Sequence, residues 1–276
     1  MASTHKTDRS ETRPHRVGEF FRSLSSDALR ELQAYVSLVC YPANTVLFEE
    51  QREANSILIL VEGCAKISVN SSDGKRLILW IARPMELLGL TSVLRGSCHE
   101  VTAETLHPCR IASIRRQEFL DFLVRYPAVY QGVARELSVE MSRVREQMRI
   151  MGLSSSASIK LAWLLLEWSA DGGRTTGQET SVSVPLTHEE MGECIGVTRE
   201  TVCRAMADLR QRRLINQDGS ALIITNRFAL ESFAQGLHQG TPREASATVN
   251  RAGRAGFPGT LPRGVTEITA GRRRLN

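Results

Sequence analysis

The sequence predicts an α+β protein in which a β-rich N-terminal half is joined by one long helix to a C-terminal winged helix-turn-helix. Three observations support this fold class. Short apolar runs alternate with turn residues in the first half of the chain. One apolar stripe at helical spacing covers about residues 127–149. Two helical patterns around a glycine corner then precede a hairpin pattern.

The N-terminal half predicts a small β-sandwich or barrel that follows an amphipathic helix around Asp27–Val39. Asp73-Gly74 is a strong hairpin dipeptide, and Gly63 marks a second turn. Strands that recur about every ten residues are typical of sandwiches and barrels. A further helix begins at Phe119–Val124. The predicted strands are Thr45–Phe48, Ser56–Val61, Ala65–Val69 and Leu77–Ile81.

A long helix from about Pro127 to Arg149 carries a single apolar stripe among Arg, Glu and Ser residues. Such a stripe is compatible with a core helix, but its intervals of three and four residues resemble a seam for a second copy of the chain. We therefore expect a homodimer. An apolar helix over Ala157–Ser169 follows. The stripe consists of Val129, Val133, Leu137, Met141, Val144 and Met148.

Two short helices around a glycine corner are predicted in the C-terminal half. Thr187 and Glu190 have the spacing of a capping box, which predicts the start of the first helix. Gly196 tolerates the left-handed backbone of a tight corner, and Thr198 can cap the second helix. The apolar runs around Asp218-Gly219 predict a hairpin that supplies the wing. The second helix should pack inward through Val202, Met206 and Leu209.

The outer face of the second helix carries residues that can read bases. A guanidinium bonds guanine O6 and N7 together, and a carboxylate accepts from the cytosine amino group. Arg199 and Arg204 would therefore read G, and Glu200 would read C. The alternative is a solvated helix face with an ion pair between Glu200 and Arg204. The agreement of cap, corner and hairpin favours sequence-specific DNA binding.

The segment RETVCR at Arg199–Arg204, the wing and the upstream order of elements resemble the Crp/Fnr family of bacterial transcription regulators over about residues 19–235. The resemblance implies a jelly-roll cyclic-nucleotide-binding-like domain, a dimerisation helix, and a dimer on a double-stranded palindromic operator with TGTGA-like half-sites. It assigns base contacts to Arg199, Glu200 and Arg204 and phosphate contacts to Thr187, Thr198 and Thr201. A contact with RNA polymerase, the target genes and the direction of regulation stay open.

The resemblance also lets the effector pocket be compared residue by residue. Members that bind cyclic AMP have a Gly followed by a Glu for the ribose and, further along, an Arg-Ser pair for the cyclic phosphate. Here Gly89 is present, Leu90 replaces the glutamate, and no Arg adjoins Ser, Thr or Ala near Glu100. A buried phosphate without a matched cation is disfavoured, and only Arg95 or protonated His99 would substitute. We expect a sensor that does not use cyclic AMP, with an unidentified effector. The candidate pocket consists of Glu86, Gly89, Leu90, Arg95 and His99.

The turns of the predicted roll depart from the family pattern. Asn44, Gln51 and Met85 stand at turn positions that often carry Gly. Asn tolerates a positive φ, whereas Gln and Met do so poorly. The shape of the roll loops is therefore open.

The six cysteines contain no C-x-x-C pair, and none precedes Cys40, so the iron–sulfur ligands of oxygen-sensing members are missing. We expect no metal and no cofactor. Cys98-His99 is the one adjacent candidate for haem ligation, and a loop without such a role is favoured. Cys203 should face outward at the DNA surface, where its oxidation would add bulk or charge beside phosphate. The alternative is a small residue tolerated there.

The composition is that of an ordinary globular protein, with 42% hydrophobic and 24% charged residues. No apolar run reaches the roughly eighteen residues of a membrane span, and the N-terminus has no apolar signal region. We expect a cytoplasmic protein without a membrane partner. From Gly240 onward, seven Arg and two Glu account for the whole net charge of +5, so charge is weak support for DNA binding. This tail, with Arg272–Arg274, should be disordered.

The sequence lacks the motifs of several common classes of enzyme. The sequence has no P-loop, no G-x-G-x-x-G after a strand, no H-E-x-x-H and no nucleophile elbow, so we expect no enzyme. Two alternatives stay open, a cyclic-nucleotide-dependent regulator with an atypical pocket and a non-specific architectural DNA-binding protein. The expected division is a disordered segment 1–18, the sensor domain 19–126, the dimerisation helix 127–153, the winged helix-turn-helix 154–235 and the basic tail 236–276.

Overall fold

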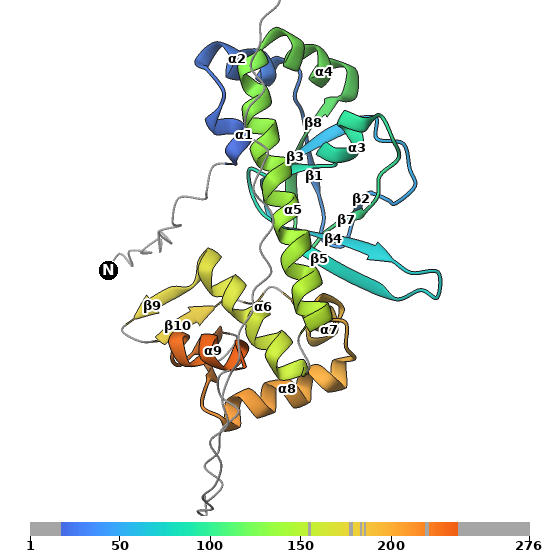
Figure 1. The fold of residues 1–276 in the computed structure, drawn as a ribbon. Helices are drawn as coiled ribbons and strands as arrows, with labels where there is room; N and C mark the ends of the chain where they lie inside the picture. The colour runs from blue at the N-terminus through green and yellow to red at the C-terminus, as the bar shows by residue number, and fades with distance from the viewer. Residues whose placement is uncertain are drawn as a thin grey trace, which may run out of the picture. The chain divides into compact units, whose positions relative to one another are not determined.

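The computed structural model describes residues 18–153, 156–176, 179–182, 184, 186–218 and 221–236. These residues belong to one compact unit that ends at Gln239. They form an α+β protein with a β-rich N-terminal half, one long helix and a C-terminal part of four helices and a small sheet (Figure 1). The predicted fold class is therefore confirmed. Residues 1–17 of the predicted N-terminal segment and residues 237–276 of the predicted basic tail, including Arg272–Arg274, lie outside the described residues.

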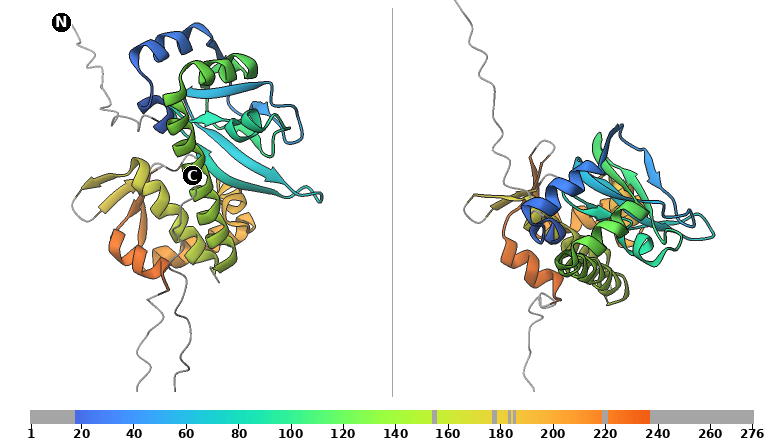
Figure 2. Two further views of the ribbon diagram at one scale, coloured as in Figure 1. Left: turned by 45° about the horizontal axis from the view of Figure 1, so that its top comes forward. Right: turned by 90° about the horizontal axis from the view of Figure 1, so that it is seen from above.

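The N-terminal half is an eight-stranded jelly roll made of two antiparallel sheets. One sheet has the strand order β1-β8-β3-β6, and the other has the order β2-β7-β4-β5. The β4–β5 hairpin extends beyond the other strands of its sheet (Figures 1 and 2). The strands are β1 (Ser37–Tyr41), β2 (Val46–Phe48), β3 (Ser56–Glu62), β4 (Ala65–Asn70), β5 (Arg76–Ala82), β6 (Leu87–Leu88), β7 (Thr102–Thr105) and β8 (Cys109–Arg115).

The four strands predicted from apolar runs are present as β2, β3, β4 and β5. The helix predicted around Asp27–Val39 is too long. The observed helix α2 (Ser26–Ala34) begins at a Ser25 cap that accepts from the Ala28 amide. Residues Ser37–Tyr41 instead form β1, which pairs with β8 from Ser37 opposite Ser113 to Tyr41 opposite Cys109. This ladder satisfies backbone groups that a continued helix would have bonded internally.

The turns of the roll keep a left-handed backbone whether or not they contain glycine. Gly63 and Gly74 have φ of 94° and 81°, as the two predicted turns require. Asn44, Gln51 and Met85 have φ of 57°, 65° and 71°. The roll therefore preserves its turn geometry at the three positions where the sequence departs from glycine.

Helices cover one side of the roll and share its core. The largest buried side chains there are aromatic, and Phe20 packs on Phe119 with ring centroids 5.9 Å apart. Burial of such rings dominates the stability of a small core. The helices of this half are α1 (Glu19–Arg22), α2, α3 (Leu90–Arg95), α4 (Arg116–Arg125) and the short 3₁₀ helix η1 (Pro127–Val129).

One continuous helix, α5 (Tyr130–Leu153), follows the roll (Figure 2). The predicted apolar stripe divides along it. Val129 and Val133 are buried in the core of the roll. The first part of the stripe therefore packs inside the protein, as a core helix would. Met141 and Met148 are 58% and 68% exposed, so the later part carries an uncovered apolar face in the single chain.

The exposed face of α5 has heptad spacing when it is followed back to the start of the helix. Tyr130 and Ala134 are exposed and take the places expected for Val129 and Val133. Intervals of four and three residues then alternate along the whole helix, which is the spacing of a coiled-coil seam. We name this face the α5 seam. It consists of Tyr130, Ala134, Leu137, Met141, Val144 and Met148.

The C-terminal part packs four helices around a small antiparallel sheet of order β11-β12-β10-β9. Its core contains the apolar residues of α6 and the inner faces of α7 and α8, including Leu161, Val202 and Leu209. The wing hairpin is present, although its tip at residues 219–220 lies outside the described residues. The elements are α6 (Ala157–Gly172), β9 (Arg174–Thr176), β10 (Glu179–Val182), α7 (His188–Ile195), α8 (Arg199–Gln211), β11 (Ile215–Asp218), β12 (Ala221–Ile224) and α9 (Arg227–Ala234).

Candidate nucleic-acid interface and effector pocket

Both helices of the helix-turn-helix begin at the predicted threonine caps. Thr187 Oγ1 accepts from the Glu190 amide at 3.2 Å, and Glu190 Oε2 accepts from the Thr187 amide at 2.9 Å, which completes the capping box. Thr198 Oγ1 accepts from the Thr201 amide at 3.3 Å at the start of α8. The caps fix where each helix starts and therefore which residues stand on its first turns.

The corner between the helices is Gly196, which has φ of 67° and caps the end of α7. A Cβ at this position would lie 2.3 Å from Met151 Cε, because the end of α5 packs against the corner. The left-handed backbone favours glycine here, whereas the flexible end of the Met151 side chain could move away from a Cβ. On the inner face of α8, Val202 and Leu209 are fully buried and Met206 is 4% exposed, as predicted.

The outer face of α8 presents the predicted base-reading residues. Arg199, Glu200 and Arg204 are all exposed on the first two turns of α8. Arg204 Nη2 donates to Thr201 Oγ1 at 3.0 Å, which steadies its side chain along the helix. Bonds from the Glu200 amide and the Thr198 hydroxyl, with smaller help from Arg199 and Arg204, lower the pKa of Glu200. The carboxylate is therefore an acceptor at neutral pH.

Cys203 is exposed on the same face of α8 and contacts the first helix of the pair. His188 Nδ1, at the start of α7, lies 3.3 Å from Cys203 Sγ. An imidazole and a thiol at this distance can form a hydrogen bond. Neighbouring residues in the sequence gave no sign of this contact, because it joins two different helices.

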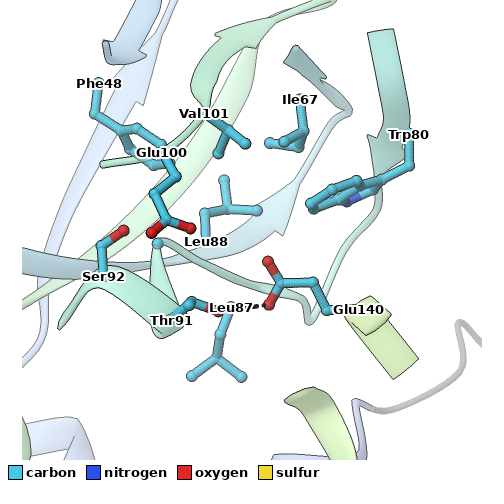
Figure 3. Close-up of a pocket in the computed structure, with 11 residues that line it drawn as sticks. Phe48, Ile67, Trp80, Leu87, Leu88, Thr91, Ser92, Glu100, Val101 and Glu140 are labelled. Atoms are coloured by element: carbon cyan, nitrogen blue, oxygen red, sulfur yellow. Dashed lines mark hydrogen bonds between the residues drawn. The ribbon is translucent and has the colours of Figure 1, made fainter. Parts of the chain in front are cut away.

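A pocket of about 60 Å³ opens in the roll beside α3 and α5. Apolar side chains make most of its wall, and Glu100 and Glu140 direct their carboxyl groups into it (Figure 3). Thr91 Oγ1 donates to Glu140 Oε2 at 3.1 Å. The lining consists of Phe48, Ile67, Trp80, Leu87, Leu88, Gly89, Thr91, Ser92, Glu100, Val101 and Glu140.

Of the five predicted pocket residues, only Gly89 belongs to this lining. Leu90 opens α3 and is 3% exposed in the core of the roll. Glu86 faces α5, where Arg143 Nη1 and Nη2 each donate to its carboxylate at 2.7 Å. Arg95 is exposed and pairs with Glu100. Four of the five predicted residues therefore do not line this cavity, since sequence adjacency to Gly89 does not determine which side chains turn into it.

His99, the fifth predicted residue, lies behind the pocket wall rather than in it. Its ring stacks on Phe48 with centroids 3.9 Å apart and is 5% exposed. A Cβ on Gly89, which has φ of 79°, would lie 2.9 Å from His99 Cε1. Burial lowers the pKa of His99, so the ring is neutral at physiological pH and does not supply a cation.

Two contacts join the β4–β5 hairpin to the helix-turn-helix. Lys66 on β4 is buried, and its Nζ lies 3.1 Å from both Glu104 Oε1 and Glu190 Oε1. Glu190 is the capping-box residue of α7, so one carboxylate serves both the cap and the ion pair. Burial acts to raise the pKa of Glu190, but the Thr187 and Lys66 hydrogen bonds outweigh it and lower that pKa.

Gln147 makes the second contact at the same place. This side chain of α5 is 8% exposed, and its Nε2 donates to Ile78 O at 3.3 Å and Cys194 O at 2.5 Å. Strand β5, helix α5 and helix α7 are therefore joined through one amide. Sequence patterns single out neither Lys66 nor Gln147, because a polar residue inside an apolar stripe has no partner visible in the chain order.

The comparisons with known proteins match both halves of the chain. Residues 38–126 match the family model described as a cyclic nucleotide-binding domain, and residues 159–233 match a Crp-like helix-turn-helix domain. The first range covers the strands of the roll, and the second covers the helix-turn-helix with its wing.

Individual relatives align over most of their own length. The chain is 28% identical over 200 residues, 72% of this chain and 82% of the relative, to the transcriptional activatory protein AadR of Rhodopseudomonas palustris. It is 24% identical over 206 residues, 75% of this chain and 92% of the relative, to the CRP-like cAMP-activated global transcriptional regulator of Mycobacterium tuberculosis. The solved structure of FixK2 from Bradyrhizobium japonicum has a similar fold, with a TM-score of 0.63 and 21% identity over 71% of this chain and 96% of that one.

No helix among the described residues is long and apolar enough to cross a membrane.

Proposed function

Because the chain belongs to the Crp/Fnr family of transcription regulators, we propose that it binds a palindromic operator with TGTGA-like half-sites as a homodimer. Membership makes it a DNA-binding regulator with a domain of the cyclic-nucleotide-binding type. The relatives are transcription regulators rather than enzymes, and the proposed function includes no catalysis. It acts on the chromosome, which locates it in the cytoplasm.

The observation that carries the proposal is the exposed first two turns of α8. Arg199 and Arg204 would each bond guanine O6 and N7, and Glu200 would accept from a cytosine amino group. Thr187, Thr198 and Thr201 are the proposed phosphate contacts. Their hydroxyls lie at the starts of α7 and α8, where helix N-termini also favour an anion. Thr187 Oγ1 already donates to Glu190 Oε2 at 3.0 Å, so its phosphate contact would replace that hydroxyl bond while the cap bond from the Glu190 amide remains.

The α5 seam supports the dimer. A helix of 24 residues that leaves Met141 and Met148 exposed at heptad spacing needs a partner surface to remove them from water. A second copy supplies the same seam about a twofold axis. Two recognition helices about one turn of DNA apart would then read the two halves of a palindrome. The proposed domain division places the seam in residues 127–153, between the sensor and DNA-binding domains.

The pocket supports control by something other than cyclic AMP. No Lys, Arg or His lines it among the described residues, and two carboxyl groups face its interior. A cyclic phosphate would enter beside negative charge without a matched cation, which is strongly unfavourable. The Mycobacterium relative is named as cAMP-activated, so a nucleotide-dependent regulator with an atypical pocket is the second candidate.

The test is fluorescence anisotropy of the purified protein on a TGTGA-N6-TCACA duplex and a scrambled duplex at about 150 mM salt, without and with cyclic AMP. We expect selective binding that does not need the nucleotide. Binding only with cyclic AMP would support the second candidate instead. A non-specific architectural protein would bind both duplexes alike and weaken steeply with salt.

A further inference from the structure

The charges inside the roll pocket are all of one sign. The two ionisable side chains of its lining are Glu100 and Glu140, which enter from different elements (Figure 3). Glu100 stands before β7 at the mouth and is exposed, whereas Glu140 comes from α5 and is partly buried. The other polar side-chain groups of the lining residues are the hydroxyls of Thr91 and Ser92 and the indole N–H of Trp80. The pocket therefore offers hydrogen-bond acceptors and negative charge.

Two arginines near the pocket lie outside its lining, and each already pairs with a carboxylate. Arg143 makes a two-pronged ion pair with Glu86, with both nitrogens 2.7 Å from carboxylate oxygens. Arg95 pairs with Glu100 at the mouth and is largely exposed. Neither residue belongs to the lining of the cavity. Glu140 is therefore the inner charge that a ligand would meet.

A cationic partner would stabilise the charged form of Glu140. Burial raises the pKa of Glu140, and the neighbouring Glu100 and Glu136 raise it further, against the lowering effects of Thr91 and Arg143. A cation beside this carboxylate would favour its charged form. Thr91 Oγ1 donates one hydrogen bond to Oε2, and a carboxylate with about four lone-pair sites can accept further bonds.

The rest of the wall favours an organic cation over a metal ion. Phe48, Ile67, Trp80 and Val101 supply apolar and aromatic surface, which a hydrated metal ion would not use. An indole face attracts an ammonium group and also packs on hydrocarbon. The pocket has a volume of about 60 Å³, so the part of the ligand that it holds has only a few non-hydrogen atoms.

We propose that the roll pocket binds a small organic cation, a protonated amine with a short apolar body, with its ammonium group at Glu140 and its hydrocarbon against Trp80. The inference deepens the proposed function and rests on it, because it names the chemical class of effector for the same sensor domain. It also reverses the charge of the ligand expected from the fold, since a nucleotide is an anion.

The test compares three molecules of one shape and different charge on the full-length protein. Isobutylamine carries the ammonium group, isobutanol is neutral and isobutyrate is an anion. Each is titrated at constant ionic strength and neutral pH, with tryptophan fluorescence and isothermal titration calorimetry as independent readouts. We expect saturable binding of isobutylamine, at least about tenfold weaker binding of isobutanol, and no binding of isobutyrate.

Variants then place the ligand. Glu140→Gln should weaken isobutylamine at least about tenfold, because it removes the charge and keeps the shape. Glu146→Gln is the matched control, because Glu146 lies on the same helix and pairs with Arg149 away from the pocket. It should leave the affinity for isobutylamine unchanged. Glu100→Gln at the exposed mouth is a second variant that leaves the packed wall intact and should weaken binding less. Trp80→Phe should remove the fluorescence signal while calorimetric binding remains.

The outcomes separate this proposal from the proposed function. Absence of calorimetric binding, equal binding of isobutyrate, or unchanged affinity in Glu140→Gln would overturn the cation proposal. Operator anisotropy on the same protein samples is measured independently. Selective operator binding without amine binding overturns only the ligand class, whereas amine binding without operator selectivity overturns only the DNA assignment.

Discussion

Lys66 Nζ lies 3.1 Å from Glu190 Oε1. This ion pair joins strand β4 of the roll to α7, the first helix of the helix-turn-helix. The side chains are 5% and 18% exposed, so the pair is largely removed from water. Glu104 shares the same ammonium at 3.1 Å, and Arg76 donates to Glu104 at 3.0 Å. A buried cation with two carboxylates is sensitive to the loss of any member, because the others are then left buried with uncompensated charge.

A double-mutant cycle should measure this coupling. Glu190→Gln keeps the capping box, which accepts Gln, and removes only the charge. We expect it to lower the free energy of unfolding by about 1 kcal/mol, and Lys66→Met by about 3 kcal/mol, with a coupling energy of about 1–3 kcal/mol from urea unfolding. The exposed Arg227–Glu231 pair is the control, with coupling below about 0.5 kcal/mol. Additive effects of Lys66 and Glu190 would mean that the pair contributes nothing.

Replacement of Arg199 should relax one base position of the operator. Arg199→Ala removes a two-bond contact to guanine, so binding to the preferred duplex should weaken by about 1–3 kcal/mol while binding to duplexes changed at that base alters little. Anisotropy with a set of singly substituted duplexes measures this. Arg210→Ala, near the other end of α8 where Arg210 bonds Gln217, should leave the base preferences unchanged. Unaltered discrimination in Arg199→Ala would remove Arg199 from the contact set.

Buried His99 should make the protein less stable in mild acid. Its pKa lies below the ordinary 6.5 because burial disfavours the charged ring. As pH falls below 6.5 the unfolded chain takes up a proton that the folded chain resists, so stability is lost between the unfolded and folded pKa values. Urea unfolding at about pH 7.5 and about pH 5.5 should show a larger loss for the wild type than for His99→Gln. His107→Gln, at an exposed histidine, should behave like the wild type.

Oxidation of Cys203 should weaken operator binding. The thiol is exposed on the reading face of α8, and its Sγ lies 3.3 Å from His188 Nδ1. Peroxide should lower the operator affinity of the wild type, reductant should restore it, and Cys203→Ser should be insensitive. Cys40→Ser is the control, since Cys40 is equally exposed but lies on β1. Cys194 should not respond, because burial raises the pKa of its thiol. If Cys203→Ser loses affinity in peroxide as the wild type does, the thiol has no such role.

A charge in the α5 seam should separate the copies. Met141→Glu places a carboxylate on the apolar face, and in a dimer the two charges would oppose each other across the seam. We expect a dimer for the wild type and a monomer for the variant by analytical ultracentrifugation, with operator affinity reduced at least about a hundredfold. Ser142→Glu adds the same charge one residue further on, at an exposed position outside the seam, and should remain dimeric. A dimeric Met141→Glu would move the interface elsewhere.

Local signals determined how much of the helix-turn-helix could be predicted. The capping box at Thr187, the corner at Gly196 and the inward positions Val202 and Leu209 depend on residues close in sequence, and the structure has them where predicted. The start of the α5 seam was predicted one residue too early, because Val129 and Val133 are as apolar as a seam requires. Their burial in the roll core depends on packing against α1 and α4, which the stripe does not encode.

Long-range pairing limited the prediction of the roll and its pocket. The start of strand β1, Ser37–Val39, was predicted as helix because its partner β8 lies about seventy residues later, and amphipathic spacing alone continued the helix. The pocket collects Phe48, Trp80 and Glu140 from β2, β5 and α5, so no window of sequence contains its lining. Gly89 is the one predicted pocket residue that lines this cavity. It could be predicted because the family motif that contains it is a continuous stretch of sequence.

The apolar face on α5 sets how the protein would respond to its own abundance. A chain that reads half a palindrome binds only weakly, so occupied operators require two copies to meet first. Below the dissociation constant of the dimer, the concentration of paired chains rises with the square of total protein. Twofold more synthesis would then give about fourfold more operator-competent protein. In the proposed dimer, the exposed methionines that one chain cannot cover would thus turn a gradual change in expression into a steeper change at the promoter.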